Sequence, residues 1–485
     1  MENLKEKTAR GLMWGGIANG LQQVLNLAFG ICLGRLLLPS DYGMVGMLAI
    51  FSAMAAALEE GGFMSALNKR KNPTHEDYNS VFWFSTLTGL TCYAILFLCA
   101  PLIADFYHRQ ELAPLARFVF LGFLITSLNV APRAYMFRNL KVKQNSLIIL
   151  CALLISGTVG VVMAWKGFAY WGLATQTVVY TGVITILSFI VTRWCPSLKV
   201  SFKPVREMLG FSSRLIVTNV FNIINQNIFP VILGRTYGDV AAGNFTQANK
   251  WNYMGHVTIT NMLWGVAQPV FTKVEDDAAR QLAVFRKLLR FTALFSFPAL
   301  FGLSLIAHEF IVLALGGKWD DSATLLQMLC IWGAFVPIQS LCSNLIISRG
   351  RSSIYMWTTI ALALTSLAAV LLCSPLGLEW MVRVFVAINI LWLLVWHYFV
   401  RREIGLSLYA LIADLLPYAA LACALCIGTH FLTAGMENLW LRMAAKILIV
   451  GAAYCLVLWA SGSVIFRESM EFIFRKKKNA AEKNP

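Results

Sequence analysis

Two matched rows of amide side chains are the first residues of this sequence whose spacing suggests chemistry. Each row has three members at i, i+3 and i+7, positions that share one face of a helix. The rows are Asn19, Gln22 and Asn26 and, two hundred residues later, Asn219, Asn222 and Gln226. Amides within apolar helices either line a hydrated cavity or hydrogen-bond to a neighbouring helix. Both roles remain open for a single residue, whereas the matched rows favour a cavity.

The repeat extends beyond the amides. The tripeptide Leu-Gly-Arg ends both helices, and a glycine follows each arginine by eight residues, at Gly43 and Gly243. The two arginines, Arg35 and Arg235, lie at the predicted outer surface. They are candidates for an outer gate, although each alone is better explained as an anchor at headgroup level.

Four basic residues fall within predicted apolar helices: Arg133, Arg214, Lys250 and Lys446. A base inside a membrane costs several kcal/mol unless it is solvated or paired. Lys250 lies about 13 Å below the predicted outer boundary, at 1.5 Å per residue. We therefore predict that Lys250 is a cavity cation, with a structural ion pair to a carboxylate as the alternative.

The other three bases lie in less central positions. Arg214, two turns from the predicted inner end, either lines the cavity or anchors its helix. Arg133 follows Pro132, which removes a backbone donor and can kink the helix, but its inner position favours anchoring. Lys446 belongs to the last two helices, outside the repeat, and is not counted as a site residue.

Two carboxylates, Glu59 and Glu60, lie about two turns from the inner end of the second predicted helix. Carboxylates at this depth are candidates for coupling to protons or sodium ions. A salt bridge to Lys69 or Arg70 is the slightly favoured alternative.

The elements that carry these residues are predicted to be transmembrane helices. The 485-residue chain is 58% hydrophobic and 13% charged, with a mean hydropathy of +0.67, whereas about a quarter of a soluble domain is charged. A span needs about 20 apolar residues. We predict an all-α polytopic membrane protein with about fourteen spans. They cover residues 11–37, 43–67, 79–104, 112–138, 144–165, 168–193, 207–235, 241–271, 286–316, 323–348, 352–374, 378–400, 408–433 and 438–464.

The distribution of charge predicts the orientation. Most of the 40 basic residues lie in alternate connections and in the basic tail, for example at residues 69–71 and 475–478. By the positive-inside rule, the N and C termini are both predicted to be cytoplasmic. Membrane insertion thus accounts for most of the net charge of +16, and no nucleic-acid partner is predicted.

The repeat predicts two lobes. Spans 1 and 7 run in the same direction, so the halves are predicted to be related by a pseudo-two-fold axis along the membrane normal. We predict an N-lobe at residues 1–200 with spans 1–6 and a C-lobe at residues 201–405 with spans 7–12. Spans 13 and 14 occupy residues 406–466, and the cytoplasmic tail occupies residues 467–485.

An enzyme is not predicted. The predicted outer loops are short, and the six histidines are scattered without nearby catalytic partners. The eleven cysteines lie mostly within apolar spans, where they pack as small hydrophobic residues. We expect no cofactor and no metal site.

Three stretches resemble one transporter family. They are "LGRLLLPSDYGMVGM" at 33–47, "EEGGFMSALNKRKNPTHEDYNSVFWFSTLTG" at 59–89, and the segment from "NQNIFPVILGRTYG" to "VAQPVFTKVEDD" at 225–277. Together they resemble the Wzx-type exporters (flippases) of the multidrug/oligosaccharidyl-lipid/polysaccharide (MOP) superfamily, particularly the colanic-acid-exporter-like branch. The resemblance covers the whole chain, and its second stretch is the most specific.

The resemblance implies a function. The cargo would be an undecaprenyl-diphosphate-linked oligosaccharide, a repeat unit of O-antigen, capsule or exopolysaccharide. Alternating access would carry it across the bacterial inner membrane, coupled to a proton or sodium counter-ion. The implied partners are this polyprenyl-diphosphate lipid, the membrane lipids and the glycan polymerase and export machinery. The alternatives are a multidrug/cation antiporter and a peptidoglycan-precursor flippase of the same superfamily.

Overall fold

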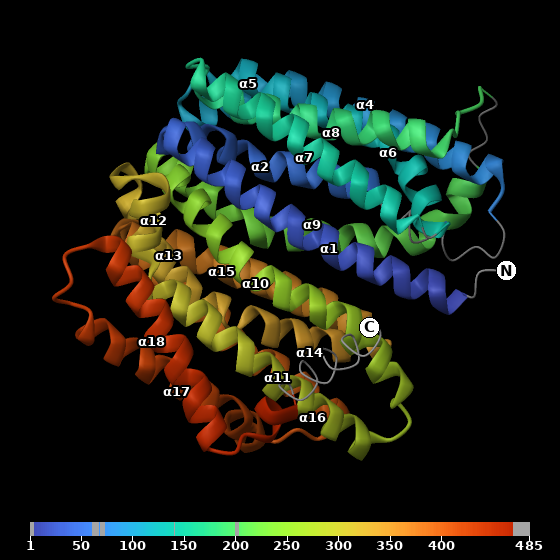
Figure 1. Ribbon diagram of the computed structural model, residues 1–485. Coiled ribbons are helices and arrows are strands. Elements are labelled where there is room, and N and C mark those ends of the chain that lie inside the picture. The colour runs from blue at the N-terminus through green and yellow to red at the C-terminus, as the bar shows by residue number, and fades with distance from the viewer. Residues whose placement is uncertain (1–3, 61–66, 68–72, 140, 199–202, 469–485) are drawn as a thin grey trace, which may run out of the picture. The chain divides into compact units, whose positions relative to one another are not determined.

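The computed structural model describes residues 4–60, 67, 73–139, 141–198 and 203–468, without the side chains of residues 4–17, 55–60 and 203–219. Over this part of the chain the regular elements are helices (Figure 1). They form two compact units, Met1–Thr246 and Gln247–Pro485.

The first unit consists of long helices that run side by side (Figure 1). They are α1 (Leu4–Leu36), α2 (Pro39–Glu60), α4 (His75–Tyr107), α5 (Leu112–Val119), α6 (Leu121–Arg138), α7 (Val142–Trp165), α8 (Tyr170–Thr192), α9 (Lys203–Thr236) and the beginning of α10 (Gly238–Lys273). Helix α7 packs against α1 and α8, α6 packs against α4 and α8, and α9 packs against α2 and α4.

The second unit contains the rest of α10 and the remaining elements. They are α11 (Ala278–Leu305), α12 (Ala307–Leu315), η1 (Gly317–Trp319), α13 (Asp320–Gly333), α14 (Val336–Ser348), α15 (Ser352–Cys373), η2 (Ser374–Leu376), α16 (Leu378–Ile404), α17 (Leu408–Leu432) and α18 (Leu439–Ala460). Helix α11 packs against α13 and α17, and α16 packs against α13, α14 and α15.

Each predicted span overlaps a helix or two consecutive helices, although residues 61–66 of span 43–67 lie outside the described residues. Spans 112–138, 286–316 and 323–348 are each divided, at Phe120, at Ile306 and at residues 334–335. Within the described residues, ten segments are long and apolar enough to cross a membrane. The chain is therefore a polytopic α-helical membrane protein. The other four predicted spans correspond to α1, α2, α9 and α10, which include the two helices with the amide rows.

Local sequence explains the start of α4. Thr74 accepts a hydrogen bond from the backbone N–H of Asp77, and the Asp77 carboxylate accepts one from the Thr74 N–H. This reciprocal capping box satisfies two N–H groups that a helix start leaves without partners. The capping box lies within the second family-like stretch of the sequence.

The compact units differ in extent from the predicted lobes. The predicted C-lobe begins at residue 201, whereas α9 and residues 238–246 of α10 belong to the first unit. The reason is that α9 packs along α2 and α4. Gly234 of α9 allows this contact, because a Cβ there would overlap the side chain of Met47 on α2.

Candidate functional site

A polar pocket lies between α6, α7 and α8 of the first unit. Its volume is about 230 Å³, and Arg133 lines it. Seven of the nine lining residues are polar: Thr126, Asn129, Arg133, Asn145, Tyr180, Thr181 and Thr185. We call this cavity the Arg133 pocket. A polar cavity within apolar helices is costly unless it holds water or a polar ligand, so it is a candidate binding site.

In the Arg133 pocket, two threonine hydroxyls and one amide oxygen keep hydrogen-bonding capacity for a ligand. The hydroxyls of Thr181 and Thr185 donate to backbone carbonyls of α8 and α6, so each keeps its capacity to accept. Asn129 is buried, and its Oδ1 atom has no hydrogen-bond partner among the described residues. The Arg133 side chain is exposed and lies five residues, or about 7 Å, from the end of α6.

These features give the pocket a definite chemical preference. An arginine recognises a carboxylate or phosphate through two parallel hydrogen bonds. The hydroxyl and amide groups around it can bind the hydroxyls of a sugar. The sequence suggested anchoring for Arg133; the structure places it in a polar cavity whose other members come from two further helices.

Lys250 lies half-buried on α10, in the second unit. Its ammonium group is 5.3 Å from the centre of the Trp251 ring, within the range of a cation–π interaction. Trp251 is fixed by an edge-to-face contact with Phe310 of α12. Among the described residues, no carboxylate lies within ion-pair distance of Lys250, which does not favour the alternative of a structural ion pair. Lys250 remains a predicted cavity cation.

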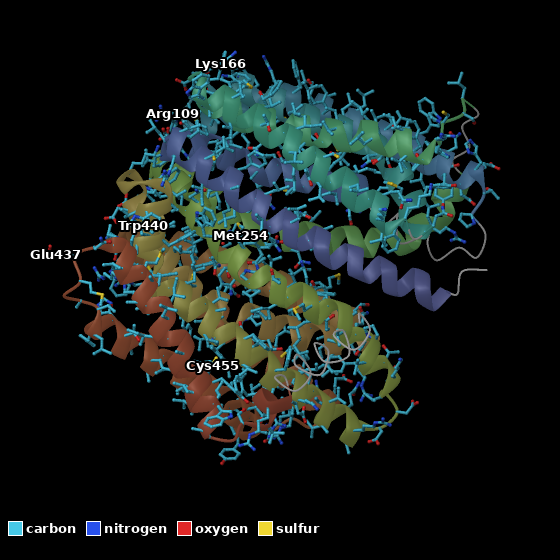
Figure 2. The ribbon with its side chains drawn as sticks, in the orientation of Figure 1. Arg109, Lys166, Met254, Glu437, Trp440 and Cys455 are labelled. Carbon is cyan, nitrogen blue, oxygen red and sulfur yellow. The ribbon has the colours of Figure 1, made fainter. Side chains whose placement is uncertain are left out.

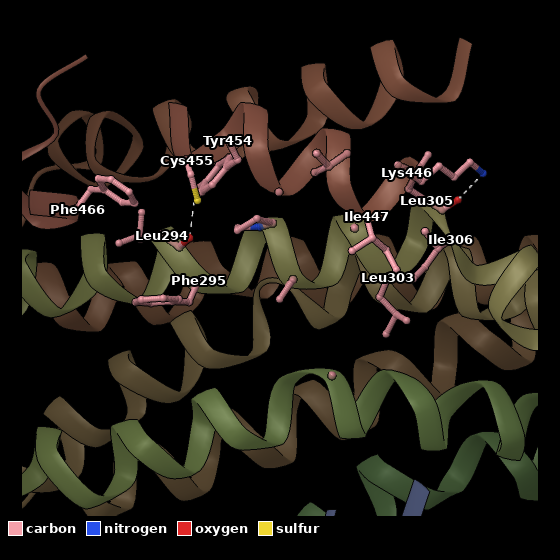
Figure 3. Close-up of a pocket in the computed structure, with 16 residues that line it drawn as sticks. Leu294, Phe295, Leu303, Leu305, Ile306, Lys446, Ile447, Tyr454, Cys455 and Phe466 are labelled. Carbon is pink, nitrogen blue, oxygen red and sulfur yellow. Dashed lines mark hydrogen bonds between the residues drawn. The ribbon is translucent and has the colours of Figure 1, made fainter. Parts of the chain in front are cut away.

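Lys446 is a structural residue in the second unit. Its ammonium group donates to Glu309 Oε1 at 2.5 Å and to the Leu305 carbonyl at 3.0 Å. Arg442 lies 2.9 Å from the same carboxylate oxygen. Lys446 also lines an apolar pocket of about 620 Å³ with residues of α11 and α18 such as Leu294 (Figure 3). Lys446 is paired with Glu309, so it is not a free cation at this pocket.

The amide rows lie on helices with different main neighbours. Helix α1 packs against α7, whereas α9 packs against α2 and α4. Asn19 and Gln226 are exposed, and the other three described members, Gln22, Asn26 and Asn222, are half-buried. Cavity lining by these rows therefore stays a prediction.

Of the two gate candidates, Arg235 has the better described surroundings. Its guanidinium group lies 5.4 Å from the centre of the Phe106 ring on α4. Arg35 is exposed at the end of α1. The side chains of four other candidates, Arg214, Asn219, Glu59 and Glu60, lie outside the described residues, so their predicted roles stand as predictions.

Two groups of contacts were not predicted from the sequence. Arg109 forms an ion pair of 2.8 Å with Asp239 at the start of α10, and it lies at the same end of the first unit as Lys166 (Figure 2). Asn79 Oδ1 accepts from the Ser197 N–H, and Trp83 Nε1 donates to the Ser197 carbonyl. Asn79 and Trp83 belong to the family-like stretch 59–89, which was the signal in the sequence, and they hold Ser197 in the segment between α8 and α9.

In the part of the chain that the structure describes, no three His, Cys, Asp or Glu side chains are grouped so that they could hold a metal ion.

Comparison with known proteins identifies relatives that cover most of the chain. Residues 32–324 match the family described as "Polysaccharide biosynthesis protein". The lipopolysaccharide biosynthesis protein WzxC of Escherichia coli (strain K12) is 27% identical over 358 residues, 73% of this chain and 72% of that protein. The teichuronic acid biosynthesis protein TuaB of Bacillus subtilis (strain 168) is 23% identical over 403 residues, 81% of this chain and 83% of that protein.

Solved structures show the same fold. The lipid II flippase MurJ, in an inward closed conformation, has a TM-score of 0.75 at 15% identity, over 94% of this chain and all of that chain. An inward-facing multidrug resistance MATE family transporter of the MOP superfamily has a TM-score of 0.64 at 17% identity, over 79% of this chain and 94% of that chain.

The fold thus defines the class, a polytopic α-helical membrane protein with the fold seen in MurJ and in this MATE transporter. Within it, the chain belongs to the polysaccharide biosynthesis protein family, because the family match covers more than half of its length. The resemblance predicted from the sequence is confirmed.

Proposed function

We propose that this protein is a flippase for undecaprenyl-diphosphate-linked oligosaccharides, the precursors of a surface polysaccharide. The diphosphate and the hydrated sugars must cross about 30 Å of hydrocarbon, whereas the polyprenyl tail can stay in lipid. The protein must therefore supply polar and cationic groups inside the membrane. Its role is that of a transporter rather than of an enzyme.

The observation that carries this proposal is the family match over residues 32–324. The names of the relatives agree with it: WzxC, TuaB and the succinoglycan biosynthesis transport protein ExoT of Rhizobium meliloti (strain 1021) are all named for polysaccharide pathways. The geometry supports it through the Arg133 pocket, where a cation and sugar-compatible hydroxyls occur together among apolar helices.

Two rival cargoes fit less well. A multidrug/cation antiporter would favour acidic groups for a cationic cargo, whereas Arg133 lines the polar pocket and Lys250 has no carboxylate partner among the described residues. A peptidoglycan-precursor flippase is suggested by the likeness to MurJ, but at 15% identity this likeness concerns the fold. The family match supports a polysaccharide precursor as the cargo.

The proposed mechanism is alternating access in the bacterial inner membrane. We place fourteen spans in two six-helix lobes plus α17 and α18, with both termini in the cytoplasm. In this orientation the Arg133 pocket lies towards the cytoplasmic side, where lipid-linked precursors are assembled. Coupling to protons or sodium, with Glu59 and Glu60 as candidates, and contact with the glycan polymerase and export machinery complete the proposal.

A gene deletion in the native bacterium tests the function. The surface polysaccharide is expected to disappear, and the lipid-linked oligosaccharide is expected to accumulate in the inner leaflet. The wild-type gene restores export, and an Arg133→Gln gene restores it poorly at equal protein level. Unchanged surface polysaccharide, in a strain without a second exporter, would contradict the proposal.

A further inference from the structure

Two glycines related by the sequence repeat meet in the first unit. Gly43 lies near the start of α2, and Gly243 lies near the start of α10. A Cβ atom on Gly43 would overlap the backbone carbonyl oxygen of Asp239, and a Cβ atom on Gly243 would overlap that of Pro39. The Gly243 Cβ would also lie 2.9 Å from the Gly43 nitrogen.

This contact has the symmetry of the repeat. Pro39 and Asp239 are separated by two hundred residues, as are Gly43 and Gly243. Gly43 therefore faces the carbonyl group of Asp239, four residues before Gly243, and Gly243 faces the carbonyl group of Pro39, four residues before Gly43. The hydrogen that replaces each Cβ points at a carbonyl oxygen, the arrangement of Cα–H···O contacts between closely packed helices.

Two further close approaches lie beside the same crossing. A Cβ on Gly46, one turn further along α2, would lie 2.6 Å from the Thr246 hydroxyl oxygen of α10. The ion pair between Arg109 and Asp239 joins the connection after α4 to the start of α10 at 2.8 Å. The Asp239 side chain is only 11% exposed, so this pair is partly shielded from solvent.

The position of the crossing gives it a role. Helices α2 and α10 belong to different predicted lobes, and both begin at the predicted outer end of the protein. We propose that the Gly43–Gly243 crossing is a gate that closes the outer end of the transport path, and that it separates when the protein opens outward. This inference rests on the proposed function, because a gate presupposes a path.

The two glycines allow the gate to close because backbone meets backbone. An alanine at position 43 or 243 meets a carbonyl oxygen that cannot rotate away. An alanine at Gly46 meets the end of the Thr246 side chain, which can move. A Cβ atom on Gly20 of α1 would have no other atom within 4 Å, so Gly20 serves as the matched control. Alanine at Gly43 or Gly243 is therefore expected to disturb closure of the gate most, alanine at Gly46 less, and alanine at Gly20 least.

Spin labels measure the gate directly. One label replaces Leu38 and the other replaces Val240, whose side chains are 55% and 48% exposed beside the crossing. The parent is a variant in which the eleven cysteines are replaced and which purifies as a folded protein like the wild type. In lipid nanodiscs without substrate, the parent is expected to show a short-distance population. Gly43→Ala should lower the ratio of short to long distances at least about tenfold, because overpacking commonly costs more than such a population change.

The control variants make the outcome decisive. Gly20→Ala should keep the parental distances, and Gly46→Ala should show a smaller loss that Thr246→Gly reverses. If Gly43→Ala does not fold, this reversal alone decides the test. Parental distances in folded Gly43→Ala, or in Gly46→Ala, would overturn the gate. The readout needs no cargo, so a failed export assay would reject the proposed function without changing this result.

Discussion

The buried ion cluster of the second unit gives the most quantitative prediction. The Glu309 side chain is 1% exposed, that of Lys446 is 2% exposed, and that of Arg442 is 25% exposed. Replacing Lys446 by Met keeps the volume but leaves the carboxylate buried with Arg442 as its remaining partner, and the Leu305 carbonyl loses a donor. Removing one member of a buried pair costs about 3–5 kcal/mol. Because Arg442 remains, we expect a loss at the lower end of this range, about 3 kcal/mol.

Thermal unfolding of the purified protein measures this loss through tryptophan fluorescence. Lys446→Met should lower the unfolding temperature by a few degrees. The double variant with Glu309→Leu should recover part of the loss, because it removes the buried carboxylate, whereas Arg442, 25% exposed, loses its partner. Lys287→Met is the matched control, because Lys287 pairs with Glu468 while 59% exposed, and exposed pairs contribute about 0–1 kcal/mol. An unchanged unfolding temperature in folded Lys446→Met would refute the argument.

Three further predictions concern transport and the connection between α8 and α9. Arg133→Gln should lower export of the lipid-linked oligosaccharide about tenfold or more, whereas replacement of the exposed Arg193 by Gln should not. Equal export by the two variants would show that the Arg133 pocket is not part of the transport path. Lys250→Gln should reduce export, whereas Lys166→Gln, at an exposed connection, should leave export unchanged. Normal export by Lys250→Gln at normal expression would exclude Lys250 as a phosphate ligand. Asn79→Ala should speed proteolysis near residue 197 by removing the 2.8 Å hydrogen bond to the Ser197 N–H, and a wild-type digestion rate would exclude a fastening role.

The helices were largely predictable. In a membrane, the backbone N–H and C=O groups of a long apolar segment must find partners within the protein, and a helix provides them. The run 144–165 became Val142–Trp165, and 408–433 became Leu408–Leu432. The breaks were less predictable. Neither Phe120 nor Ile306 is a helix breaker, so the local sequence does not predict these two interruptions. After the break at residues 334–335, Pro337 stands in the first turn of α14, where the N–H group that proline lacks would have no partner within the helix.

The site was predictable only in part, since its members come from different helices. Apolar patterning identified Arg133 and Lys446 as unusual bases, but it could not show that Asn129 and Tyr180 share a pocket with the first or that Glu309 pairs with the second. Such partners depend on packing rather than on local sequence.

Reconstitution tests the central claim most directly. The purified protein is placed in liposomes that contain undecaprenyl-diphosphate-linked oligosaccharide on one leaflet, and a membrane-impermeant glycosidase reports the fraction that reaches the other leaflet. We predict transfer that depends on the protein, is strongly reduced by Arg133→Gln and is retained by Arg193→Gln. Transfer no faster than in protein-free liposomes, by folded protein with its native lipid-linked glycan, would contradict the account.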